Sequence, residues 1–360
     1  MKLSDLDIII TAPPAPGWGG RYWILVKVTS DTGIVGWGEC YASSVGPEAM
    51  KAVITDVFAR HMAGENPENI ELMFRRVYST GFTQRPDLTV MGTWSGLEMA
   101  CWDMVGKDRN RPAHAMIGGR VNDRIRAYTY LYPLKHHPLP AFWADADMAA
   151  ESAVALVKQG YTAVKFDPAG PYTIRGGHMP SMHDIDTSVT FCRTIREAVG
   201  NQADLLFGTH GQFSTAGAIR IGQALEPFSP LWYEEPTPPD ADMSAVTSAV
   251  RVPVATGERL TTKSEFVAAL KAGVQILQPA LGRAGGIWEA KKIAVIAETY
   301  NAQMAPHLYA GPIEWAANIQ LAASIPNILM AETIETDFHF ALIKNSLSVE
   351  GGYIPVPTAA

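Results

Sequence analysis

The sequence is poor in cysteine, in long apolar runs and in positive charge, and each shortage excludes a class of protein. Its three cysteines, Cys40, Cys101 and Cys192, are far apart and in no metal-type spacing. This excludes a disulfide framework and fits a reduced intracellular compartment. No apolar run reaches the ~20 residues of a membrane span, and the start, MKLSDLDIII, is too acidic for a signal peptide. We therefore expect a cytoplasmic protein without membrane contact.

The net charge and the chain length further narrow the possible classes of protein. The formal net charge of −7 at pH 7 argues against nucleic acid as a partner. Hydrophobic content of 47% and charged content of 18% are typical of an ordinary globular protein. A (β/α) barrel takes about 250 residues. The 360 residues of the chain would therefore leave roughly 110 for a second domain.

The N-terminal part is predicted to form a small α+β domain. Short apolar segments up to Glu39 predict an antiparallel sheet, with a hairpin turn at Asp31-Thr32-Gly33. The apolar period then becomes helical until about Arg109. The loop PAPGWGGR carries Trp18, and we interpret it as a flap over a site, although a plain long connection is the alternative.

The remainder alternates strand and helix patterns, which favours a barrel over an open sheet. We divide the chain into a capping domain (1–119), a barrel (120–334) and a tail (335–360) that we expect to pack on the capping domain. The predicted strands are Ile125–Tyr132, Ala163–Asp167, Leu205–Gly208, Leu231–Glu234, Val252–Thr256, Gln275–Gln278, Gln303–Pro306 and Ile328–Glu332.

Titratable residues occur at the ends of most predicted strands, where barrel enzymes place their chemistry. Glu234 and Glu258 follow two successive strands, and paired buried carboxylates suggest a bound hard cation. Structural ion pairs are the alternative, because Arg259 is adjacent to Glu258 and Glu235 to Glu234. The other strand-end residues are Lys165, Asp167, His210, His307 and Glu332.

The order of motifs resembles the mandelate racemase/muconate lactonizing branch of the enolase superfamily over nearly the whole chain. The motifs are IVGWGE, WDMVGKDRNRPAHAMIGG, VKFD, WYEEP, TGERL, LQPALGRAGGI and MAPHLYAGPIEWA. The resemblance implies an α+β capping domain on a (β/α)₇β barrel, with Mg²⁺ and a flap that closes over the substrate. It also implies removal of the proton next to a carboxylate to give a metal-stabilised enediolate.

The same resemblance implies a role for each strand-end residue. Glu234 and Glu258 would be two of three metal ligands, in keeping with the preference of Mg²⁺ for carboxylate oxygens. Lys165 would contact the substrate carboxylate, and His307 would be the general base or acid. Glu332 would donate a hydrogen bond to the substrate carboxylate, provided that it is protonated.

Three positions depart from the family pattern. Gly208 stands where the third metal-ligating Asp is usual, so His210 or Asp167 could complete the ligand set, with Mn²⁺ as an alternative to Mg²⁺. His210 also matches the acid histidine of the family's sugar-acid dehydratases. Asp167 replaces the second lysine of the racemase Lys-x-Lys pair, and Ala280 replaces the Asp that orients His307.

These observations predict a metal-dependent dehydratase that converts an aldonic or aldaric acid to a 2-keto-3-deoxy acid. A sugar-acid cycloisomerase or epimerase is the enzymatic alternative, and a catalytically inactive protein that binds a sugar acid is the other. We expect a small-molecule carboxylate as substrate, contacted by Trp18, Tyr172 and Arg175. The resemblance also implies a homo-oligomer.

Overall fold

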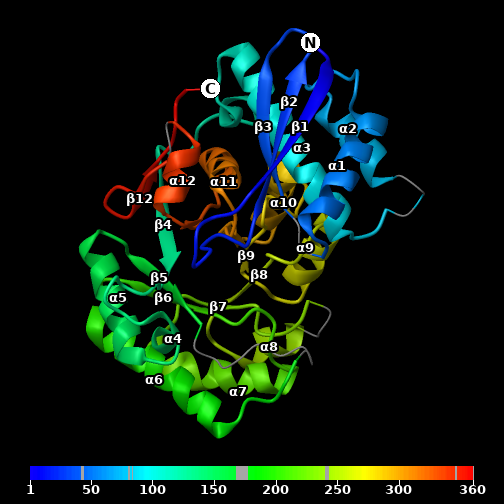
Figure 1. Cartoon of the computed structure of the whole chain (residues 1–360). Helices are drawn as coiled ribbons and strands as arrows, with labels where there is room; N and C mark the ends of the chain where they lie inside the picture. The colour runs from blue at the N-terminus through cyan, green and yellow to red at the C-terminus, as the bar shows by residue number, and fades with distance from the viewer. Residues whose placement is uncertain are drawn as a thin grey trace.

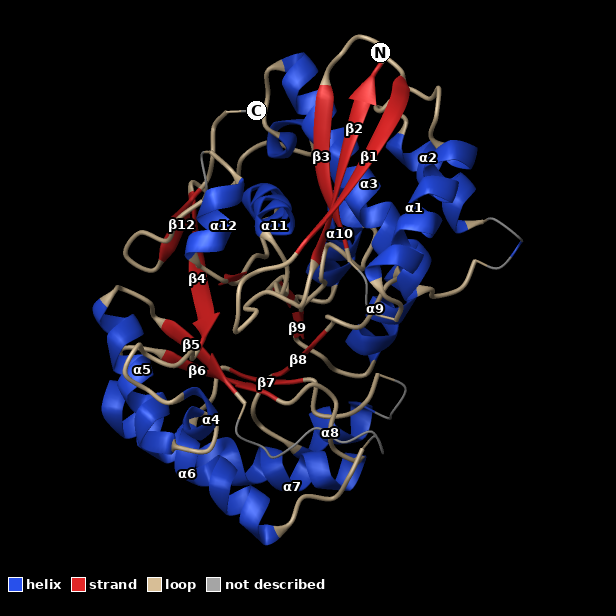
Figure 2. Ribbon diagram, in the orientation of Figure 1, coloured by secondary structure: helices blue, strands red, loops and turns tan. Residues whose placement is uncertain are grey.

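The computed structural model contains a small α+β domain above a barrel (Figure 1) and describes residues 1–41, 44–79, 82, 84–167, 177–239, 243–344 and 347–359. In the small domain, the strands form an antiparallel sheet of order β1-β2-β3, and three helices lie beside it (Figure 2). Its elements are β1 (Leu3–Thr11), β2 (Trp23–Ser30), β3 (Val35–Cys40), α1 (Pro47–His61), α2 (Ile70–Tyr78) and α3 (Leu88–Arg109). The expected capping domain is present.

The IVGWGE motif has a packing role in this domain. A Cβ on Gly36 would overlap the carbonyl group of Ala100, and one on Gly38 would overlap that of Gly96. Glycine therefore lets α3 lie directly on β3. The motif therefore brings the helix close to the sheet.

The larger part is the predicted (β/α)₇β barrel. Described strands β4 to β11 pair in parallel in the order β10-β9-β8-β7-β6-β5-β4-β11. Backbone hydrogen bonds from Met304 N to Asn327 O (2.8 Å) and from Leu329 N to Met304 O (2.8 Å) close the circle between β10 and β11. The strands are β4 (Arg124–Tyr130), β5 (Ala163–Phe166), β6 (Asp204–Gly208), β7 (Trp232–Glu234), β8 (Val254–Thr256), β9 (Ile276–Leu277), β10 (Gln303–Met304) and β11 (Ala331–Thr333).

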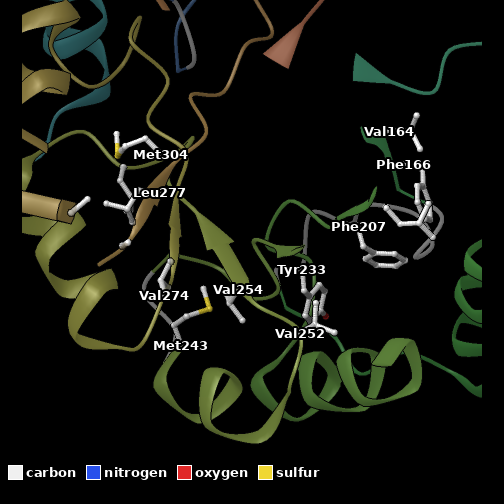
Figure 3. Packing of buried hydrophobic residues seen from close by; sticks show 14 of the residues in the cluster. Val164, Phe166, Phe207, Tyr233, Met243, Val252, Val254, Val274, Leu277 and Met304 are labelled. Carbon is white, nitrogen blue, oxygen red and sulfur yellow. The ribbon is translucent and has the colours of Figure 1, made fainter. Parts of the chain in front are cut away.

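Helices surround this barrel and bury the outward side chains of its strands. Val164 and Phe166 of β5, with Phe207 of β6 and Tyr233 of β7, belong to this outer core (Figure 3). The helices are α4 (Leu139–Phe142), α5 (Ala146–Lys158), α6 (Met182–Val199), α7 (Thr215–Leu225), α8 (Met243–Ala249), α9 (Lys263–Lys271), α10 (Gly286–Thr299) and α11 (Pro312–Ser324). Short 3₁₀ turns occupy Ala113–Met116 and Glu226–Phe228.

The tail contacts both parts of the molecule. Phe338 and His339 in α12 (Asp337–Leu342) pack on Trp23 of β2, with ring centroids 5.4 and 4.7 Å away. In contrast, β12 (Tyr353–Pro355) pairs antiparallel with barrel strand β4. Packing on the capping domain is therefore only part of what the tail does.

Two buried carboxylates join the capping domain to the barrel. Glu98 of α3 accepts hydrogen bonds from Ile287 N (2.9 Å) and Trp288 N (2.8 Å) at the start of α10. Glu39 of β3 accepts one from Gly311 N (2.6 Å) just before α11. N–H groups at a helix start have no partner within the helix and favour a carboxylate. The capping domain is thus attached to the two barrel helices nearest to His307.

Candidate active site

One layer of the barrel, directly above its interior core, holds four of the candidate site residues, namely Lys165, Glu234, His307 and Glu332. The inner core contains Tyr128, Ala163, Leu206, Trp232, Ala255, Ile276, Ala305 and Met330. Side chains two apart on a strand share a face. Moving two residues onward therefore gives the inward positions at the carboxyl ends of the strands, namely Tyr130, Lys165, Gly208, Glu234, Gly257, Gln278, His307 and Glu332.

Lys165 is a fully buried cation in this layer. Its Nζ lies 2.5 Å from Glu234 Oε1, 3.4 Å from Glu332 Oε1 and 5.2 Å from the centre of the Tyr130 ring. Although burial acts to lower it, Glu234 and Glu332 raise the pKa of Lys165 well above its ordinary value. The residue is therefore a permanent positive charge that can bind a carboxylate.

His307 lies between two carboxylates. Its Nδ1 is 3.1 Å from Glu332 Oε2 and 3.3 Å from Glu258 Oε2. Ala280, opposite His307 in the sheet, cannot supply the carboxylate that the family pattern expects there. Glu258 and Glu332 instead place negative charge beside Nδ1, although Nδ1 makes no hydrogen bond of good geometry among the described residues. This charge favours the tautomer with its proton on Nδ1 and a lone pair on Nε2. Although burial acts to lower it, these carboxylates raise the pKa of His307.

The environment of Glu332 corrects one expectation. Although burial acts to raise it, Lys165 and His307 lower the pKa of Glu332 to about 2. Leu308 N also donates a hydrogen bond to Glu332 Oε2 (2.8 Å). With no metal or substrate bound, these neighbours favour the ionised form of Glu332, which is against the expectation of a protonated side chain that donates to the substrate.

His210, Glu234 and Glu258 form a group that could hold a metal ion, since one donor atom from each lies within 4.8 Å of the other two. Glu258 Oε2 is buried without a hydrogen-bond donor among the described residues. In Glu234, Oε2 accepts hydrogen bonds from Trp232 Nε1 (3.0 Å) and Gln278 Nε2 (2.6 Å). Two carboxylates and one imidazole fit a divalent cation such as Mg²⁺ or Mn²⁺.

Asp167 is outside this group and contacts Nδ1 of His210. Its Oδ2 lies 3.1 Å from His210 Nδ1. A carboxylate on one ring nitrogen orients a histidine so that the other nitrogen can bind a metal. Although burial acts to lower it, Glu258 and Asp167 raise the pKa of His210 to about 9 in the absence of a metal. Asp167 therefore has the position of a supporting residue.

The position of the usual third ligand, Gly208, is crowded by neighbouring side chains. It pairs with Glu234 in the sheet, so its side chain would point into the same layer. A Cβ there would lie 3.2 Å from Tyr130 Oη and 3.3 Å from Lys165 Cε. An aspartate at this position would therefore require Tyr130 or Lys165 to shift.

The candidate flap packs on aromatic side chains of the barrel. Trp18 lies 4.6 Å from Tyr132, beyond β4, and 6.1 Å from Trp143, beside α4, between ring centroids. This contact places the loop above the strand ends, as a flap requires. Tyr172 and Arg175, the other residues predicted to contact substrate, lie outside the described residues.

Two further polar residues at the strand ends, Gln278 and Arg283, were missed from the sequence, and a third, Arg259, was considered only as an ion-pair partner of Glu258. Gln278 binds Glu234, as described above. Arg259 Nε lies 3.1 Å from Glu235 Oε2 but 3.9 Å from Glu258 Oε1. Arg283 Nη1 donates a hydrogen bond to the Glu258 carbonyl group (2.8 Å). All three occur in motifs already noted, TGERL and LQPALGRAGGI, but the residue order does not reveal which side chain each one contacts.

A second cluster of possible metal ligands does not fit a cation. It consists of His136, His137 and Glu151. Leu134 N donates to His137 Nδ1 (3.2 Å), so the proton of the neutral ring is on Nε2, where it faces Glu151 Oε2 at 2.9 Å. This arrangement attaches α5 to the loop after β4 and leaves no lone pair on Nε2 for a metal.

Comparison with known families agrees with this geometry. Residues 19–118 match the mandelate racemase / muconate lactonizing enzyme N-terminal domain, and residues 147–360 match the enolase C-terminal domain-like family. The chain belongs to the mandelate racemase/muconate lactonizing enzyme family of the enolase superfamily.

Individual relatives include sugar-acid dehydratases. A D-gluconate/D-galactonate dehydratase from Picrophilus torridus is 33% identical over 334 residues, which are 89% of this chain and 81% of the relative. A D-xylonate dehydratase from Haloferax volcanii is 32% identical over 94% of this chain and 82% of the relative. A crystal structure of a mandelate racemase/muconate lactonizing enzyme-like protein from a Roseovarius species is 75% identical, with a TM-score of 0.98 over 100% of this chain and 91% of that one.

No helix in the described part of the chain is both long enough and apolar enough to cross a membrane.

Proposed function

We propose that the protein dehydrates an aldonic or aldaric acid to a 2-keto-3-deoxy acid and needs a divalent cation to do so. The observation that carries the proposal is the arrangement of His307, whose Nδ1 contacts Glu258 and Glu332 in the same layer as Lys165 and the cation-binding group. The names of the relatives from Picrophilus torridus and Haloferax volcanii support the reaction class.

His210, Glu234 and Glu258 would hold the cation, with Asp167 orienting His210. When bound, a divalent cation neutralises negative charge that develops on a substrate carboxylate. Lys165 would bind the same carboxylate as a fixed charge. Glu332 would hold Lys165 and His307 in place as an ionised side chain, and Trp18 would cover the substrate. Tyr172 and Arg175 remain proposed substrate contacts.

His307 would move the protons. Its Nε2 takes the proton from C2, next to the substrate carboxylate, and the electron pair of that bond forms a double bond as the C3–O bond breaks. The hydroxyl group departs as water, with a proton supplied by the imidazolium of His307. The enol product then becomes the 2-keto-3-deoxy acid. One histidine serves as base and acid here because His210 is assigned to the cation.

The test is incubation of the protein in D₂O with D-gluconate, D-galactonate, D-xylonate and a set of aldarates, with Mg²⁺ or Mn²⁺, followed by NMR. We expect a 2-keto-3-deoxy product that disappears on chelation with EDTA and in Glu258→Gln. Deuterium exchange at C2 or lactone opening without dehydration would instead identify an epimerase or a cycloisomerase. Absence of both reaction and bound metal would indicate a sugar-acid-binding protein without catalysis.

His210→Asn separates the two roles open to that histidine. We expect it to weaken Mn²⁺ binding and to abolish both C2 exchange and dehydration. If the variant binds Mn²⁺ normally and still exchanges the C2 proton but no longer dehydrates, His210 is the acid and not a ligand.

The homo-oligomer remains a prediction, which sedimentation velocity would test.

A further inference from the structure

The loop that carries His210 has an unusual backbone. His210 has a φ of 47° and Gly211 one of 69°, and Glu235, just after the neighbouring strand β7, has a φ of 40°. Left-handed φ values are uncommon for residues other than glycine and cost free energy. Two of them in adjacent loops of one site mean that the surroundings hold this backbone in place.

Hydrogen bonds join the two loops. Gly211 N donates to the Glu235 carbonyl group (2.6 Å), and Thr209 Oγ1 lies 2.7 Å from the carbonyl oxygens of both Glu234 and Glu235. The loop after β6 is therefore fastened to the end of β7. These bonds hold the residues on either side of His210 but do not involve the carbonyl group of His210 itself.

Arg259 holds the carbonyl group of His210. Its Nη2 donates a hydrogen bond to the carbonyl oxygen of His210, and its Nε lies 3.1 Å from Glu235 Oε2. Glu235 is 2% exposed, so its carboxylate needs a nearby cation. A Cβ on residue 211 would come within 2.5 Å of Arg259 Nη1, so Gly211 makes room for the guanidinium group. Arg259 thus bridges the His210 backbone and a buried carboxylate of the next strand.

We propose that Arg259, held by Glu235, is a positioning residue that keeps the His210 ring turned toward Glu234 and Glu258. The inference rests on the proposed function, in which His210 completes the cation-binding group. Gly208 cannot supply a ligand from within β6, so the ligand must come from the loop. An imidazole two residues later reaches the group only while its backbone keeps the left-handed turn.

A purely structural role for Arg259 predicts something different. A brace that only stabilises the barrel would lower the melting temperature and leave cation binding unchanged. A positioning residue changes the affinity for the cation and the way His210 contacts it, even in a variant that folds normally.

The experiment uses the full-length protein with Mn²⁺ as the probe. Calorimetric titration gives the Mn²⁺ affinity, and electron spin-echo envelope modulation detects imidazole nitrogen bound to Mn²⁺. We expect Arg259→Gln to bind Mn²⁺ about 10- to 100-fold more weakly, as for the loss of a residue that supports a metal ligand, and to lose most of the nitrogen coupling. His210→Ala should lose that coupling completely.

Two further variants complete the design. Arg259→Lys keeps a positive charge but cannot bridge both partners, so its affinity should lie between wild type and Arg259→Gln; it is also the variant to measure if Arg259→Gln does not fold. Arg251→Gln is the matched control, because Arg251 is an exposed arginine whose partner Glu226 is 3.9 Å away. It should bind Mn²⁺ like the wild type.

The outcomes separate the two proposals. If the wild type binds Mn²⁺ with nitrogen coupling and both Arg259 variants keep the same affinity and coupling, the positioning role is wrong and the proposed cation site stands. If the wild type binds no Mn²⁺, or binds it without nitrogen coupling, the assignment of His210 to the cation is wrong and the positioning role falls with it.

Discussion

Two sets of carboxyl groups in this protein are both buried, but their pKa values are shifted in opposite directions from the ordinary value. Glu39 and Glu98 connect the capping domain to the barrel, and burial raises the pKa of each to about 8. Glu258 and Glu332 lie at the strand ends, and there the cationic side chains outweigh burial and lower the pKa of both. Burial alone therefore does not determine the charge of a carboxylate; its neighbours do.

The partners of each set explain the difference. The interface carboxylates accept hydrogen bonds from backbone N–H groups at the starts of α10 and α11. The strand-end carboxylates contact Lys165, His210 or His307, whose full charges favour the ionised form far more strongly. A cluster of buried opposite charges is typical of a functional site, whereas a carboxylate at a helix start is typical of packing.

The largest expected effect is the difference in activity between two variants, in which one glutamate of each set is replaced by glutamine. Glu258→Gln should reduce kcat/KM for the substrate identified by NMR by at least about 10²- to 10³-fold, because it removes a preorganised charge. Glu98→Gln should leave kcat/KM within about tenfold and reduce the free energy of unfolding by about 1–3 kcal/mol, because one backbone N–H loses its acceptor. Steady-state kinetics and denaturant unfolding of both variants check this.

Either of two results would contradict this contrast between the strand-end and interface carboxylates. A fully active Glu258→Gln variant would mean that this strand-end carboxylate is not needed for the chemistry. A Glu98→Gln variant that is folded and inactive would mean that the interface carboxylate contributes directly to it.

A second prediction concerns Gly208, where the family pattern has a ligand. Gly208→Asp should not restore activity and should destabilise the protein by about 1–3 kcal/mol, because the new side chain would displace Tyr130 Oη or Lys165 Cε, which lie 3.2 and 3.3 Å from its Cβ. The double variant with Tyr130→Phe should recover part of that stability. Greater stability or activity in Gly208→Asp alone would show that the layer can accept a third carboxylate.

The smallest effect is a pH dependence of stability that arises at the interface. Glu98 has a pKa of about 8 when folded against an ordinary value of 4.5. Between these values the unfolded chain releases a proton that the folded chain retains, so the free energy of unfolding falls as pH rises from about 5 to 8. A shift of one pKa unit corresponds to about 1.4 kcal/mol. Between pH 5 and 8 the free energy of unfolding of Glu98→Gln should therefore fall by at least about 1 kcal/mol less than that of the wild type.

Urea unfolding of wild type and Glu98→Gln at several pH values measures this slope. Equal slopes would mean that Glu98 is ionised in the folded protein at neutral pH, like the carboxylates at the strand ends.

The barrel and most of its strand-end residues could be predicted because they depend on local pattern. Core strands are short apolar runs, and a residue two positions beyond the inner core must face the mouth. This reasoning located Lys165, Glu234, His307 and Glu332, and the family resemblance supplied their expected roles. It did not predict that β12 would pair with β4, because strand pairing over such a distance leaves no trace in the local pattern.

The sequence by itself determined the fold, the layer of candidate residues and the absence of an aspartate at positions 208 and 280. Only the tertiary structure decided which groups compensate for those absences. Glu258 and Glu332 contact His307 in place of a residue at 280, and Arg259 pairs with Glu235 more closely than with its neighbour Glu258. The reason is geometric, because the partner of a side chain depends on the direction in which that side chain points. In a strand, the alternation of side chains sets this direction, but the left-handed backbone at His210 and Glu235 breaks the alternation.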